Sequence, residues 1–147
     1  MTYNDWLDFI KKIETSKLSD DMLDVIKNNQ LNDSFKENVL TKMDEAIYKR
    51  LSTATENISS KLTYLFEDEY LMEMQLVIFK KEAKILYKIV KSGIFSQEYV
   101  EKRTEQIRDD VDKIFDILYN EANKIDFSGV LGMSIKNNRI RWDKDEL

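Results

Sequence analysis

A row of carboxylates between residues 98 and 116 is the feature of this sequence with the clearest capacity for chemistry. Its members recur every three or four residues, which places their side chains on one face of an α-helix. Such a row can be the solvated outer face of a helix, or it can attract the basic surface of a partner protein. Docking would explain why repulsion between like charges, about 0.2–0.5 kcal/mol per pair, is tolerated. The candidate partner-binding residues are Glu98, Glu101, Glu105, Asp109, Asp112 and Asp116.

The same row contains a pattern that can bind a metal ion. Glu98 and Glu101 form an ExxE pair, and two carboxylates one turn apart can hold Mg²⁺. All-α nucleotide pyrophosphohydrolases combine such a pair with an ExxD pair on the next helix, whereas Asp109 and Asp112 fall on the same helix here. The acidic group at 67–73 could supply a second helix, although negative charge there also compensates a helix dipole. A carboxylate- and Mg²⁺-dependent hydrolase of this type is the second alternative function.

A second candidate surface lies near the end of the sequence. Basic side chains flank a tryptophan there, and this combination can bind an acidic protein surface or single-stranded nucleic acid. Acidic residues at 143, 145 and 146 dilute that charge. We expect Ile140 and Trp142 to pin this segment onto the rest of the molecule. The secondary binding candidates are Arg139, Arg141 and Trp142.

The composition removes many other kinds of chemistry. The 147 residues include no histidine and no cysteine, which excludes thiolate nucleophiles, disulfides, histidine relays and HExxH zinc sites. The sequence also has no glycine-rich phosphate loop and no GxSxG motif. There are 28 acidic and 23 basic residues, for a net charge of −5. This mild acidity argues against a general affinity for nucleic acids or anionic membranes.

Residues 20–50 have the outline of a helix-turn-helix, because a short helix is predicted before a longer one. The second of these helices would carry Lys36, Asn38 and Lys42 toward a nucleic acid, but acidic residues are interspersed with them. Phosphate contacts require an excess of positive charge, which this segment lacks. A DNA-binding regulator using residues 20–50 is therefore the first alternative function.

The elements that position these residues are expected to be helices. The sequence has no proline and three glycines, which favours long helices over turn-rich β structure. A stretch at 51–60 rich in serine and threonine allows a break, but the unbroken apolar spacing favours one helix through it. Apolar periodicity predicts helices at 3–15, 20–29, 33–66, 67–92 and 97–126.

The two last helices of this series should pair as an antiparallel hairpin around a turn at 91–95. Apolar positions spread over more than half the circumference of helix 67–92, which predicts that it is the most buried helix. After Gly129 the pattern changes, and we expect a short irregular or β-hairpin tail.

The sequence as a whole predicts an all-α, elongated helical bundle in one domain, 1–147. It divides into two short helices at 1–31, a long-helix bundle at 32–129 and a tail at 130–147. No signal peptide or membrane span is evident, so we expect a cytoplasmic protein. The leading hypothesis is a non-catalytic protein-binding regulator, such as an inhibitor, an immunity protein or a regulator of bacterial or phage mobile elements. We expect no cofactor and a partner protein with a basic surface, and a homodimer and a monomer are equally compatible with the sequence.

Overall fold

The computed structural model describes residues 1–124 and 130–144, and within these ranges it has seven helices and no strand. The starts of α1, α2, α5 and α6 fall within about two residues of those that apolar periodicity predicts. The helices are α1 (Tyr3–Thr15), α2 (Asp21–Asn28), α3 (Lys36–Ser59), α4 (Leu62–Phe66), α5 (Glu69–Val90), α6 (Gln97–Lys124) and α7 (Val130–Lys144).

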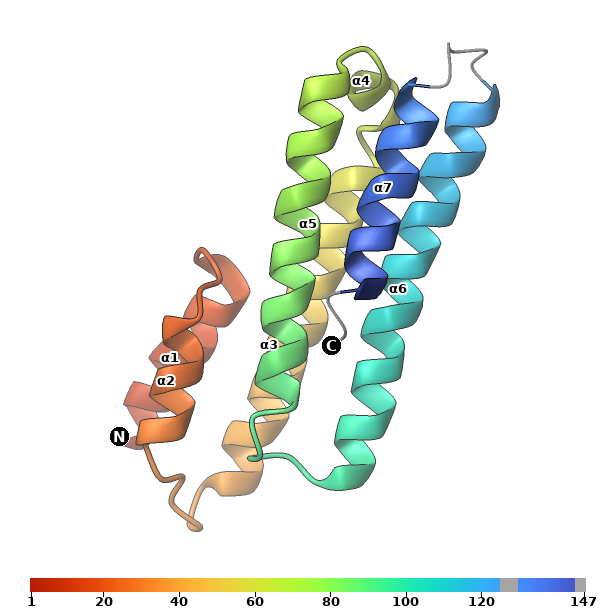
Figure 1. Ribbon diagram of the computed structural model, residues 1–147. Coiled ribbons are helices and arrows are strands. Elements are labelled where there is room, and N and C mark those ends of the chain that lie inside the picture. Colours follow the sequence, from red (N-terminus) through yellow and green to blue (C-terminus); the bar gives the residue numbers. More distant parts are fainter. Residues whose placement is uncertain (125–129, 145–147) are drawn as a thin grey trace.

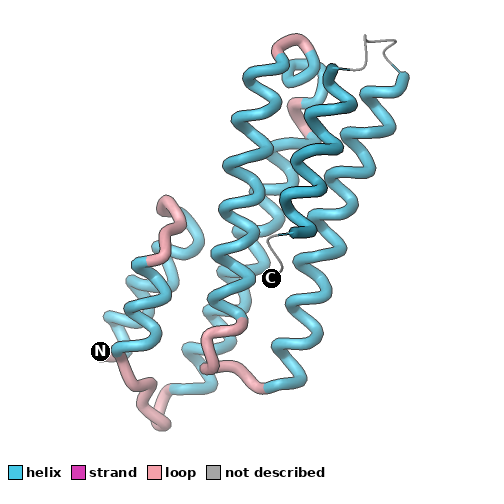
Figure 2. The backbone as a smooth tube through the Cα atoms, in the orientation of Figure 1, coloured by secondary structure: helices cyan, strands magenta, loops and turns pink. Residues whose placement is uncertain are grey.

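Figure 1 shows an elongated bundle in which α3, α5, α6 and α7 run alternately up and down. The lower part carries the first two helices, with α1 packed on α3 and α2 packed on α5. The upper part carries α4, which contacts α5 and α6, and α7, which lies against the same two helices. Loops are confined to the ends of the helices (Figure 2). Buried apolar side chains from all seven of these helices join in one hydrophobic cluster.

Local capping explains why several helices begin where they do. Thr2 and Asp5 form a capping box at the start of α1, and Asp68 accepts hydrogen bonds from the first amides of α5. The hydroxyl of Ser96 accepts from the amide of Tyr99 at the start of α6. Gly93 has a φ of 101° in the loop before it, a backbone conformation that side chains disfavour. These caps satisfy amides that a helix start leaves without intrahelical partners.

Arg50 ties the first helix to the bundle. Its Nη1 donates to the carbonyl oxygens of Ser16 (2.6 Å), Ile13 (3.4 Å) and Glu14 (3.4 Å), at the C-terminal end of α1. Its Nε lies 3.1 Å from Oε2 of Glu82 on α5. A guanidinium on the last carbonyls of a helix satisfies acceptors that the helix leaves open and opposes the negative end of its dipole.

The expectation of an irregular or β-hairpin tail is wrong for residues 130–144, because they form α7. Ile135, Asn138 and Trp142 are buried, and their spacing of three and four residues places them on one helical face. Burial of this face against α5 and α6 outweighs the poor helix propensities of Gly132 and the asparagines. Ile140, which was expected to help pin the segment, is 42% exposed. Residues 145–147 lie outside the described range.

The prediction of one continuous helix at 33–66 is also wrong. The chain leaves the helix after Ser59 and enters α4 at Leu62. Before the break, hydroxyl groups bond to backbone carbonyls one turn earlier, as Ser59 Oγ does with the carbonyl of Thr55 (3.1 Å). Such bonds compete with regular helix geometry. The buried Leu65 and Phe66 after the break explain why the apolar pattern alone did not reveal it.

Helix α5 has more buried residues than any other helix of the described chain, as expected for 67–92, but its two halves differ. Its C-terminal half is enclosed, and Leu86, Ile89 and Val90 have almost no exposed surface. Its N-terminal half leaves Met74 and Ile78 more than one-third exposed. Every helix in the described residues is too short or too polar to cross a lipid bilayer.

Candidate functional site

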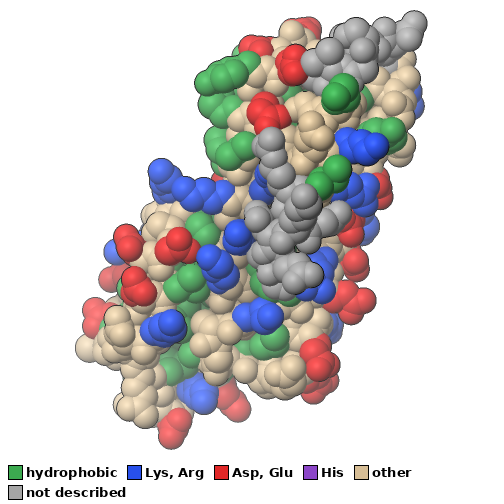
Figure 3. Space-filling model, in the orientation of Figure 1, with side chains coloured by type: hydrophobic (Ala, Val, Ile, Leu, Met, Phe, Trp, Pro, Cys, Tyr) green, Lys and Arg blue, Asp and Glu red, His purple; other side chains and the backbone are tan. Residues whose placement is uncertain are grey.

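The acidic row lies on the outer face of α6, where its residues share one side of the helix. The opposite face of α6 packs into the core, where the buried side chains are Ile107, Val111, Ile114 and Leu118. Figure 3 shows acidic side chains along the right-hand edge of the molecule, over this helix. Five of the six carboxylates are exposed and one is half-buried; the five are Glu98, Glu101, Glu105, Asp109 and Asp116, and the sixth is Asp112.

The C-terminal end of the row is occupied by a side chain of α7. Arg139 places its Nη1 2.8 Å from Oδ1 of Asp116 and its Nη2 3.6 Å from Oδ1 of Asp112. The two carboxylates are one helical turn apart, so one guanidinium can contact both. The structure thus joins residues that the sequence assigned to two separate surfaces.

The N-terminal end of the row faces solvent. Gln97 Nε2 donates to Glu101 Oε1 at 3.4 Å along the same helix. Within the described residues, none of the carboxylates at 98, 101, 105 and 109 forms an ion pair. The row is therefore divided into an occupied end, Asp112 and Asp116, and an open end, Glu98, Glu101, Glu105 and Asp109.

A polar cluster, here called the Arg103 hub, fixes the open end of α6 to α3. Arg103 Nη2 donates to Asp44 Oδ1 at 2.5 Å, and Tyr99 Oη donates to the same oxygen at 2.7 Å. The guanidinium also lies 5.7 Å from the ring centroids of Tyr48 and Tyr99, within cation–π range. Gln106 accepts another hydrogen bond from Arg103. The hub consists of Asp44, Tyr48, Tyr99 and Arg103.

The electrostatics of the hub hold its protons in place. Burial raises the pKa of Tyr99, and its hydrogen bond to the Asp44 carboxylate raises it further. Burial acts to lower the pKa of Arg103, but its bond to Tyr99 and the charge of Asp44 outweigh this and raise it. Tyr99 and Arg103 therefore both stay protonated well above neutral pH. The hub is a fixed anchor rather than an acid–base device.

Sequence reasoning missed the hub. Asp44 and Tyr48 stand four residues apart on α3, and Tyr99 and Arg103 stand four residues apart on α6. Each pair therefore lies on one helical face, which is a signal the sequence does contain. What it does not contain is the orientation of the two helices that brings these faces together.

Two of the three secondary candidates can be placed. Trp142 is 6% exposed in the core, and Arg139 is turned toward the acidic row. The side chain of Arg141 lies outside the described part of the structure. Between α6 and α7 a cavity of about 200 Å³ is lined by Phe115, Tyr119, Ile135, Lys136 and Arg139.

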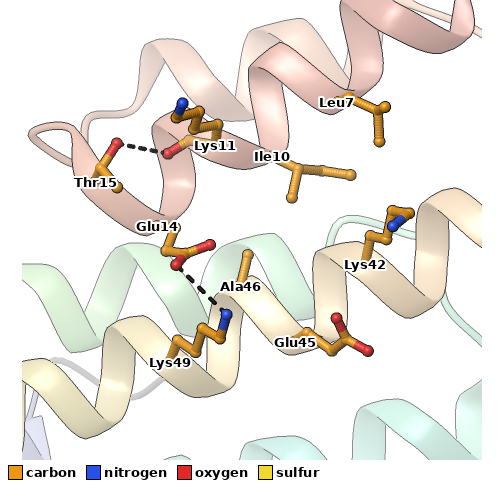
Figure 4. A pocket seen from close by; sticks show the side chains of 9 residues that line it. All are labelled: Leu7, Ile10, Lys11, Glu14, Thr15, Lys42, Glu45, Ala46 and Lys49. Carbon is orange, nitrogen blue, oxygen red and sulfur yellow. Dashed lines mark hydrogen bonds and ion pairs between the residues drawn. The ribbon is translucent and has the colours of Figure 1, made fainter.

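A shallow groove of about 310 Å³ lies between α1 and α3 (Figure 4). Ile10 and Ala46 form an apolar floor, and lysines and glutamates alternate around it. Lys49 Nζ lies 3.7 Å from Oε1 of Glu14 across the groove. Charges of both signs surround the floor, so the groove has no single electrostatic preference.

The carboxylates considered for metal binding do not converge. The described residues include no group of three or more Asp and Glu side chains placed to hold a metal ion. Asp68 caps α5. Glu73 accepts hydrogen bonds from Ser134 and from the buried Asn138, whose Nδ2 is 2.8 Å away.

The segment considered for DNA binding is partly engaged within the bundle. Helix α1 packs along α3, and Tyr3 Oη donates to Asn38 Oδ1 at 2.6 Å. Lys36 and Lys42 are exposed. Helix α2 packs against α5, and α3 packs against both α1 and α5.

Comparison of this chain with protein-family models, with curated proteins and with solved structures finds no match. The site is therefore interpreted from its own geometry and charge.

Proposed function

We propose that this protein is a non-catalytic protein-binding regulator that captures a partner with a basic surface through the open end of the acidic row. The observation that carries the proposal is four exposed carboxylates on one face of α6, next to two that already hold a guanidinium. Inhibitors, immunity proteins and regulators of mobile elements act in this non-catalytic way. We place this activity in the cytoplasm, since a fold without cysteine needs no oxidising compartment.

The contact with Arg139 serves as an internal example of the recognition. A guanidinium forms charge-assisted hydrogen bonds to carboxylates, and these are stronger than bonds between neutral groups. Spacings of three and four residues continue from Asp112 back to Glu98, so the open end offers the same arrangement to a second chain. A partner helix or loop that carries Arg or Lys at one-turn spacing fits this surface.

The Arg103 hub supports the proposal by making the surface rigid. Because α6 is fixed to α3 at Asp44 and buried along its other face, its carboxylates keep their spacing before a partner arrives. Preorganisation of this kind reduces the entropy lost on binding. Complementary charge also accelerates encounter, and salt weakens that effect.

The test is capture of the partner by the full chain from its native cell, followed by identification and a binding measurement with the purified partner. Reversal of Glu101, Glu105 and Asp109 to Lys should weaken binding by about 30-fold or more, because like charges then face each other. The melting temperature should change little, since all three side chains are exposed.

The matched control reverses three exposed carboxylates on other helices, Asp8, Asp24 and Glu56, and makes the same change in net charge. This control should bind within about threefold of the native chain. If the α6 triple variant binds the partner as well as the control does, the row is a solvated face and the proposal fails.

A further inference from the structure

The N-terminal half of α5 carries an apolar surface that no other part of the described chain covers. Its residues recur at spacings of three and four, and the stripe faces away from the core. Tyr70 is 76% exposed and Val77 is 47% exposed. Figure 3 shows hydrophobic side chains gathered at the upper left, over α5. The α5 stripe consists of Tyr70, Met74, Val77 and Ile78.

The stripe is the uncovered continuation of a face that is packed lower down. Ile78 and Ile85 are seven residues apart and so point to the same side of α5. Ile85 is buried, and three residues further along Lys88 Nζ lies 3.6 Å from Oδ1 of Asp20, at the start of α2, which packs on α5. Helix α2 does not extend to the upper half (Figure 1). The lower half of this face therefore contacts a neighbouring segment of the chain, whereas the apolar upper half stays exposed.

Charge at the two ends of the stripe favours a second copy of this chain as the cover. Glu67 and Glu69 are exposed at its N-terminal end, and Lys81 is exposed in line with it at its C-terminal end. In an antiparallel pair of α5 helices, each basic end meets the acidic end of the other copy. A parallel pair would instead place like charges together.

We propose that two copies of this protein associate through antiparallel contact of their α5 stripes, as a twofold-symmetric dimer. In this arrangement Met74 of one copy packs against Val77 of the other, in the manner of facing seam residues. Lys81 of each copy lies over Tyr70 of the other, beside its acidic helix start. The dimer rests on different residues from the proposed function, so either can fail alone.

The association is tested on the full chain by sedimentation velocity between about 1 and about 200 µM. We expect a concentration-dependent dimer. Val77→Glu should raise the dissociation constant of the dimer by about 30-fold or more. Both copies carry the substitution, so the symmetric contact would bury two carboxylates. Ile117→Glu, at an exposed isoleucine of α6, is the matched control and should leave the dimer intact. Circular dichroism verifies that both variants are folded.

A charge exchange distinguishes this arrangement from unspecific association. Lys81→Glu alone and the double change Glu67→Lys with Glu69→Lys should each weaken self-association, because each variant then opposes like charges. A mixture of the two variants should regain association, because their opposed ends are complementary again. A monomer throughout the concentration range, a dimer unaffected by Val77→Glu, or a mixture that fails to associate would each overturn the proposal. A monomer would point to another protein as the cover, and the last two outcomes would point to a different dimer geometry.

Discussion

The two halves of α6 present the same kind of side chain and are used differently. The C-terminal half lies under α7, and its outward carboxylates, Asp112 and Asp116, hold Arg139. The N-terminal half is fixed to α3 by the Arg103 hub, and its outward carboxylates face solvent.

The difference shows why one part of a charged face is occupied within the chain and another part is left open. Helical spacing makes both halves suitable for a guanidinium, but only one has a helix of the same chain to supply it. The occupied half is therefore part of the structure, and the open half remains accessible to another molecule. Changes that remove α7, the hub or Arg139 should alter the two halves in different ways.

The largest expected effect is on the C-terminal half. Trp142→Ala removes a large buried side chain from α7 and should lower the free energy of unfolding by about 3–5 kcal/mol. Hydrogen exchange should rise in residues 110–124, as the cover of this half loosens, and much less in residues 97–109. Urea unfolding and exchange mass spectrometry measure these quantities.

The matched control for this change is Ile140→Ala, an exposed position of the same helix. It should cost less than about 1 kcal/mol, because little buried surface is lost. Equal destabilisation by the two substitutions would mean that burial of Trp142 does not hold α7 in place.

The N-terminal half should respond to loss of its hub. Arg103→Met keeps a long side chain but leaves Asp44 without its cation, and should cost about 1–2 kcal/mol. Here the hydrogen exchange of residues 97–109 should rise more than that of 110–124. Lys102→Met, at an exposed neighbouring position, should leave both halves unchanged. If Arg103→Met changes neither the free energy of unfolding nor the hydrogen exchange of residues 97–109, apolar packing alone holds this half.

Much of the helical architecture could be predicted from the sequence, because it depends on local residue patterns. Apolar spacing located α1, α2, α3, α5 and α6, and the hydroxyl residues Thr2 and Ser96 cap two of these helices at the predicted starts. These features depend on residues only a few positions apart. The acidic row could be placed on one face of α6 for the same reason.

Features that depend on distant residues were not accessible. Helix α7 forms because Trp142 and Asn138 find buried positions against α5 and α6, and local propensity argued against it. The pairing of Arg139 with Asp116 joins residues 23 positions apart. The exposure of the α5 stripe likewise depends on where α2 ends, because periodicity cannot show whether an apolar face has a partner. The break after Ser59 was allowed by the sequence but hidden by regular apolar spacing.

A smaller effect is expected when the occupied end of the row is opened. Arg139→Ala should lower the free energy of unfolding by only about 0.5–1 kcal/mol, because the ion pairs are partly exposed to solvent. The same change frees Asp112 and Asp116 and extends the open row. Under the proposed function, the variant should therefore bind a basic partner at least as tightly as the native chain does. Titration calorimetry with the captured partner measures this, and weaker binding would assign Arg139 to the contact itself.

The smallest effect concerns Asp110, which stands where the two halves of α6 meet. Burial raises the pKa of its carboxyl above the ordinary value, and Lys113 opposes the shift only in part. A raised pKa means that the folded state holds the proton more tightly than the unfolded state does. The ionised carboxylate therefore disfavours folding at neutral pH, and this penalty disappears as the pH falls through the raised pKa.

Asp110→Asn removes the charge and should stabilise the protein at pH 7 by less than about 0.5 kcal/mol, since the side chain is only half-buried. Near pH 3 the native carboxyl is protonated in both states, so the difference between the two proteins should vanish. Thermal unfolding of both proteins across this pH range measures the change. A stability difference that stays constant with pH would show that packing of the amide, rather than loss of the charge, is responsible. In that case the junction between the two halves of α6 carries no electrostatic strain.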